Sequence, residues 1–174
     1  SITSPDSAQR SRTVTVMKDL CTLAAELGAR VLVHGSPDQR KLESSKDEDV
    51  CKRGADCFAA VAQAAQSCGV VYCIEPLSRD QTAFVNTIAE AAEIARQIGS
   101  PSVKTMLDCS SAALTESESI PDLIRRWIPT GLIAHVHFND PNRRGPGDGE
   151  LDFGPILEAL RQIETSGRTG LAEM

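Results

Sequence analysis

The chain has 174 residues, of which 41% are hydrophobic and 24% are charged, and its formal net charge is −6. This length and composition are typical of one ordinary globular domain with a buried core. The acidic balance argues against a nucleic-acid or anionic-membrane partner, and the apolar runs are too short to span a bilayer. The polar opening, Ser1 to Arg12, lacks the apolar segment of a secretory signal. Because the six cysteines form no CxxC pair, we expect free thiols and a cytoplasmic protein.

Apolar residues at helical spacing first predict a helix from Asp6 to Gly28. The compact run RVLVHGSP then predicts a buried strand that ends near Gly35. After a charged connection, an alanine-rich helix runs to about Cys68, where Gly69 ends it. The same alternation of strand and helix continues to the end of the chain. The later strands are expected in VVYCIEP, SVKTMLD, LIAHVHFND and TGLAEM, and the later helices at about 82–98, 120–127 and 155–166.

Five strands that alternate with five helices predict an α/β fold with a parallel sheet. In a TIM barrel of roughly 250 residues, each of the eight strand-helix units takes about 31 residues. Four polar residues that end successive strands lie 33, 29 and 36 residues apart, which matches that repeat. We therefore predict that residues 1–174 form a single TIM-barrel domain lacking about three strands, with an open sheet as the alternative for the chain alone.

Those four residues are Glu75, Asp108, His137 and Glu173. Because parallel strands place their carboxyl ends at one edge of the sheet, we expect the four side chains to converge there. Carboxylate and imidazole groups are ligands that divalent metals accept, so the pattern predicts a metal site. The simpler alternative is that the acids are rim charges, or pair with Arg79 or Lys104.

Two further groups of residues are candidates for substrate contacts. His135 and His137 alternate along one strand, so both face the same side. A lone histidine is more often a packed core residue, and we assign that role to His34 and to His135, while keeping His135 as a candidate substrate contact. The loop 142–149 carries Arg143 and Arg144 among glycines, where guanidinium and backbone N–H groups can bind sugar oxygens or anions. A plain surface loop explains the same pattern.

The motifs EPLSR, MLDCSS, HVHFNDPNRRGPGDGELDFGPIL and LAEM resemble the sugar phosphate isomerase/epimerase family. These xylose-isomerase-like TIM barrels include ketose 3-epimerases, hydroxypyruvate isomerase and inosose dehydratase. The resemblance places the strands as the fourth to eighth of the barrel. It implies one divalent ion, such as Mn²⁺, Mg²⁺, Co²⁺ or Zn²⁺, held by Glu75, Asp108, His137 and Glu173. It also implies that Arg143 binds the substrate and that a homo-oligomer can form.

The activity implied by this resemblance is isomerisation or epimerisation of a ketose or related small polyhydroxy carbonyl compound. Glu75 and Glu173 would remove and return a proton through a metal-stabilised enediolate. The chain departs from the ketose 3-epimerase pattern at Ser111 and Gln81, where that group has histidine and glutamate. Three alternatives therefore stay open: a dehydratase, an apurinic endonuclease of the same superfamily, and a non-catalytic barrel that binds a ligand.

Overall fold

The computed structural model describes residues 1–41 and 49–166. Its sheet holds four parallel strands in chain order, so each strand pairs with the next one along the sequence. The prediction of an α/β fold in the form of a partial TIM barrel is confirmed. The expected fifth strand, at 169–174, lies outside the described residues together with Glu173. The strands are β1 (Val31–His34), β2 (Val71–Ile74), β3 (Val103–Asp108) and β4 (Ile133–His137).

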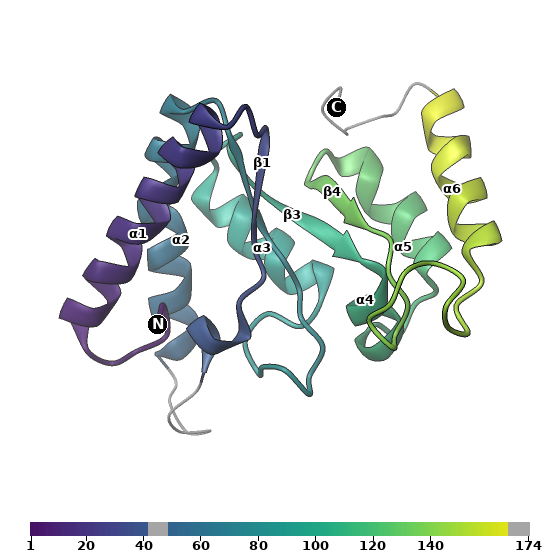
Figure 1. The fold of residues 1–174 in the computed structure, drawn as a ribbon, viewed down its shortest axis with the longest axis horizontal. Helices are drawn as coiled ribbons and strands as arrows, with labels where there is room; N and C mark the ends of the chain where they lie inside the picture. Colours follow the sequence, from purple (N-terminus) through teal and green to yellow (C-terminus); the bar gives the residue numbers. More distant parts are fainter. Residues whose placement is uncertain (42–48, 167–174) are drawn as a thin grey trace.

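The connections between the strands contain helices, because parallel neighbours need a long crossover that returns the chain to the same end of the sheet. Figure 1 shows α1 and α2 side by side near β1, whereas α5 and α6 lie beyond β4 at the other end of the sheet. Within the described chain, no helix is long and apolar enough to cross a membrane. The α-helices are α1 (Ser7–Glu26), α2 (Val50–Ser67), α3 (Ile88–Ile98), α4 (Cys109–Thr115), α5 (Ile120–Trp127) and α6 (Phe153–Thr165), and short 3₁₀ turns occur at η1 (Pro37–Arg40) and η2 (Ile128–Thr130).

Alternate strand residues face two different cores. Tyr72, Ile74 and Leu107 pack with the helices on one face of the sheet. The opposite face carries a smaller cluster, Cys73, Met106 and Ala134, which consists of strand residues. Glu75, directly after β2, and Asp108, the last residue of β3, alternate with the residues of the first face and so continue this second face.

Two sequence expectations about helices were wrong. The helix expected from residue 82 begins only at Ile88, because Thr87 caps it through a reciprocal pair of bonds with Glu90. The preceding residues form an irregular loop in which Val85 has a φ of 63°. In addition, no helix was expected between the strand SVKTMLD and residue 120: Asp108 accepts the Ser111 N–H and caps α4, so the chain becomes helical at Cys109, directly after β3.

Candidate metal and substrate site

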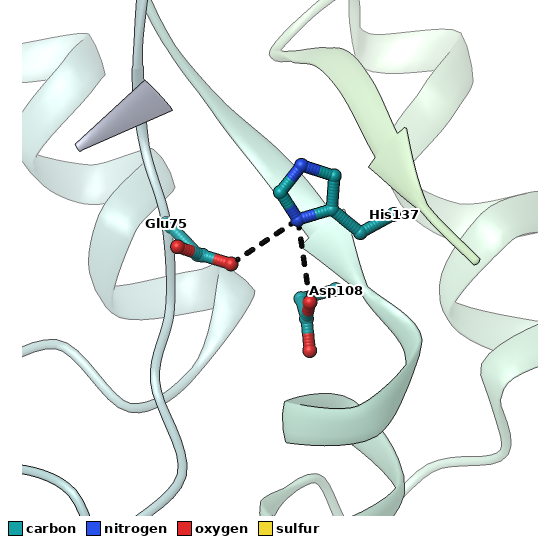
Figure 2. Close-up of side chains that lie close together, drawn as sticks. All are labelled: Glu75, Asp108 and His137. Atoms are coloured by element: carbon teal, nitrogen blue, oxygen red, sulfur yellow. Dashed lines mark ion pairs between the residues drawn. The ribbon is translucent and has the colours of Figure 1, made fainter. Parts of the chain in front are cut away.

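The candidate ligands lie where three neighbouring strands end. Glu75 directly follows β2, whereas Asp108 and His137 are the last residues of β3 and β4. One ligand atom from each of the three lies within 4.8 Å of those of the other two. The structure therefore brings together three of the four residues that the sequence singled out. Figure 2 shows the three side chains pointing toward one another across the strand ends.

A β-bulge in β4 decides which histidine reaches this position. Thr105 pairs with Ile133, yet Leu107 pairs with Val136 and Asp108 with His137, so β4 has one extra residue in this interval. An unbroken register would place Val136 opposite Asp108. The bulge thus gives Asp108 an imidazole as its neighbour instead of an aliphatic side chain.

The distances favour a shared cation over direct pairing. His137 Nδ1 lies 3.4 Å from Glu75 Oε1 and 3.4 Å from Asp108 Oδ2. A charge-assisted hydrogen bond would bring these atoms to about 2.7–2.9 Å. Ligands placed about 2.0–2.2 Å from one ion are instead roughly 3–4 Å from each other. The donor set of two carboxylates and one imidazole therefore fits a divalent metal.

Burial makes this cluster electrostatically costly without a cation. Glu75 is 8% exposed and Asp108 is 6% exposed. Burial, and next the Asp108 carboxylate, raise the pKa of Glu75, while His137 and Arg40 act in the opposite direction. Among the residues that the structure describes, both acids form ion pairs with His137 and not with Arg79 or Lys104.

A buried arginine holds the first two strand ends together behind the site. Arg40, at the end of η1, is fully buried. Its Nη1 donates a hydrogen bond of 2.7 Å to the backbone oxygen of Glu75. Its Nη2 donates to the backbone oxygen of His34. Beside it, the His34 ring is buried and its Nδ1 lies 2.7 Å from the Tyr72 hydroxyl, in keeping with the packing role expected for His34.

The ligands open into a polar cavity of about 220 Å³. Gly35 forms part of its wall, and a Cβ at that position would lie 1.6 Å from Glu75 Oε2. Gln81 and Ser111, the two departures from the ketose 3-epimerase pattern, also line the cavity. Both residues are therefore placed where they can contact a small ligand.

Arg143 lines the same cavity from the β4–α6 loop, residues 138–152. Its Nη2 lies 3.0 Å from Asp80 Oδ2, which links this loop to the β2–α3 loop. The residue adopts a φ of 65°, uncommon for a side chain larger than glycine. Arg144 is exposed, and it contributes its backbone oxygen to the Asp140 N–H.

His135 does not join the three ligands. Its ring packs edge-on against the His137 ring, with centroids 4.9 Å apart, and its buried Nδ1 has no hydrogen-bond partner among the described residues. Burial, and next His137, lower the pKa of His135, so the neutral form is favoured. A contact between His135 and substrate stays a prediction.

Sequence reasoning overlooked several residues that shape the site. Asn139 contacts Asp108 directly, Asp80 pairs with Arg143, and Arg40 is buried against Glu75. The signals for Asn139 were its place two residues after His137 and its position inside the family motif HVHFNDPNRRGPGDGELDFGPIL. Asp80 and Arg40 lie in polar connections that look like solvent-exposed chain.

The fold and the site together define a class of protein. A sequence model described as the xylose isomerase-like TIM barrel matches residues 1–173, and the chain belongs to this family. A D-psicose 3-epimerase of Agrobacterium fabrum is 36% identical over 115 residues, which cover 66% of this chain and 39% of that protein. Another D-psicose 3-epimerase, from Enterocloster bolteae, is 30% identical over 160 residues, covering 90% of this chain and 52% of that protein.

Solved structures agree with the sequence relatives. A crystal structure of D-psicose 3-epimerase in the presence of D-fructose matches with a TM-score of 0.81 at 29% identity, over 94% of this chain and 56% of that chain. A structure of L-ribulose 3-epimerase matches with a TM-score of 0.80 at 27% identity. The chain spans about half the length, or less, of the curated relatives it matches.

Proposed function

We propose that this protein is a divalent-metal-dependent epimerase or isomerase of a ketose or a similar small polyhydroxy carbonyl compound. The observation that carries the proposal is the convergence of Glu75, Asp108 and His137 within 4.8 Å at three successive strand ends. The resemblance to D-psicose and L-ribulose 3-epimerases supports the choice of a sugar substrate. Glu173 is proposed as the fourth ligand from the family motif alone.

The chemical problem is to remove a proton from a carbon next to a carbonyl group. A bound divalent ion, for example Mn²⁺, Mg²⁺, Co²⁺ or Zn²⁺, would stabilise the negative charge that develops on the carbonyl oxygen. Glu75 would accept the proton, and its raised pKa brings the carboxylate closer to the basicity that this task needs. Arg143, freed from Asp80, would orient substrate oxygens.

The product depends on where the second acid returns the proton. Delivery by Glu173 to the opposite face of the same carbon gives an epimer. Delivery to the neighbouring carbon interconverts an aldose and a ketose. We propose Glu75 and Glu173 as this acid-base pair, with Arg143 and His135 as substrate contacts.

The test replaces the proposed base without changing its shape. In the intact protein, Glu75→Gln should lower both Mn²⁺ occupancy and turnover across a panel of ketoses. Lys104→Gln, at a half-buried position earlier on β3, is the matched control and should leave both unchanged. Full metal occupancy together with full turnover in Glu75→Gln would rule the proposal out.

A further inference from the structure

Asn139 is tied at both ends of its side-chain amide. Its Nδ2 donates to Asp108 Oδ2 at 2.8 Å, and its Oδ1 accepts the Ser110 N–H at 3.0 Å. The amide can satisfy both partners in only one orientation. The Ser110 N–H is a donor and needs the amide oxygen, whereas the Asp108 carboxylate only accepts and needs the NH₂ group. The Ser110 N–H therefore determines that the NH₂ group faces Asp108.

These bonds hold the Asp108 carboxylate in one rotation. Asp108 Oδ1 accepts the Ser111 N–H at 2.7 Å, while Oδ2 accepts the Asn139 amide. Oδ2 is also the atom that lies 3.4 Å from His137 Nδ1. A carboxylate oxygen can accept two bonds. The Asn139 bond therefore uses one lone pair of Oδ2 and leaves the other available to bind a metal ion.

The loop that carries Asn139 is itself anchored at the next residue. Asp140 is fully buried, and its Oδ1 accepts the Leu151 N–H at 3.0 Å. Its backbone N–H donates to the Arg144 oxygen, and its backbone oxygen accepts the Arg143 N–H. Asn139 therefore reaches Asp108 from a fixed base, although its own side chain is only half-buried.

From this arrangement we infer that Asn139 is a positioning residue, which orients Asp108 for metal binding without binding the metal itself. This inference rests on the proposed function. Groups that orient a ligand in this way raise metal affinity by about 10–100-fold. A residue that acted only by stabilising the loop would affect metal affinity no more than another residue that anchors the same loop, such as Asn142.

The experiment measures Mn²⁺ affinity by calorimetric titration of the intact protein, beside urea unfolding in the presence of a chelator. Asn139→Ala should weaken Mn²⁺ binding by about 10-fold or more. Asn139→Ser, which retains one short polar group, should fall between the parent and Asn139→Ala, and it serves if the alanine variant does not fold.

Asn142→Ala is the matched control. This asparagine lies in the same loop and also uses both ends of its amide, donating to the Asp148 oxygen and accepting the Arg144 N–H, but it touches none of the three ligands. Its Mn²⁺ affinity should stay within about twofold of the parent, as expected for a group outside the ligand shell.

Three outcomes would count against the inference. If the parent binds Mn²⁺ and Asn139→Ala binds it equally well, the positioning role fails while the proposed metal site stands. If Asn142→Ala loses as much affinity as Asn139→Ala, loop rigidity is responsible, and the specific role of Asn139 is wrong. If the parent itself does not bind Mn²⁺, the proposed metal function and this inference fail together.

Discussion

Asp108 and His137 are backbone partners across β3 and β4, although an unbroken register would pair Asp108 with Val136. The extra residue in β4 moves every later side chain by one position. Together with Glu75, this pairing concentrates two buried carboxylates beside one imidazole. Without a bound cation, these close, buried charges should lower the free energy of unfolding.

Glu75→Gln should therefore stabilise the metal-free protein. Its raised pKa means that the folded state disfavours the ionised carboxylate, so a neutral side chain of the same shape should raise the free energy of unfolding at neutral pH. Urea unfolding with a chelator present measures this change. Glu158→Gln is the control and should give no gain, because Arg161 favours the ionised form there. A less stable Glu75→Gln protein would contradict this account of the site.

Gly35→Ala should displace Glu75 without unfolding the protein. The new methyl group would lie 1.6 Å from Glu75 Oε2, and the end of that side chain can swing aside. The loss of one ligand should weaken Mn²⁺ binding by about 10-fold or more, as read by calorimetry. Gly145→Ala has open space around its Cβ and should bind Mn²⁺ like the parent. Unchanged affinity in Gly35→Ala would mean that Glu75 is not a ligand.

Gly149→Ala should destabilise the β4–α6 loop. Its Cβ would lie 2.2 Å from Asp140 Oδ1 and 2.9 Å from Asp140 Cβ, so turning the carboxylate does not remove the clash, and Asp140 Oδ1 also accepts the Leu151 N–H. We expect a loss of about 1–3 kcal/mol in the free energy of unfolding, as for other overpacked positions. Gly145→Ala, in the same loop, should lie within about 0.5 kcal/mol of the parent. Equal stability of the two variants in thermal unfolding would refute the steric argument.

The buried His34 should make stability depend on pH. Burial, and next Arg40, lower the pKa of His34 to about 3, well below the usual value near 6.5. Between these two values the unfolded chain takes up a proton that the folded protein excludes, so this contribution to stability is complete above about pH 6.5 and is lost as the pH falls. Relative to His34→Gln, the parent should lose about 1.6 kcal/mol between pH 6.5 and 5.0. If the free energies of unfolding of the two proteins change equally with pH over this range, His34 is not held neutral.

Arg143→Ala should impair substrate binding more than folding. Its ion pair with Asp80 is exposed on both sides, and such pairs contribute about 0–1 kcal/mol. A lost guanidinium contact to substrate oxygens should raise KM by about 10-fold or more in ketose assays. Arg144→Ala, which keeps the backbone contact to Asp140, is the control and should have a normal KM. Equal KM values for Arg143→Ala and the parent would remove Arg143 from the substrate site.

Local patterns were sufficient for most of the fold. Apolar runs such as VVYCIEP and the glycine stops after the helices predicted four described strands in the right order, because burial on both faces of a parallel sheet demands continuous apolar sequence. Such patterns failed at Asp108–Ser111 and at Thr82–Thr87. In both places the helix begins where a side chain accepts a hydrogen bond from a backbone N–H and caps it. The spacing of apolar residues gives no sign of such a cap.

The sequence by itself determined that Glu75, Asp108 and His137 meet: residues that end successive parallel strands lie at one edge of the sheet, because parallel strands run in the same direction. Only the tertiary structure decided how they meet. Three contacts between segments distant in sequence show this. The bulge in β4 places His137 opposite Asp108, Gly35 lacks a side chain and leaves room for Glu75, and the Asn139 amide orients the Asp108 carboxylate. Contacts of that kind depend on the packing of three loops at once, so no single stretch of sequence records them.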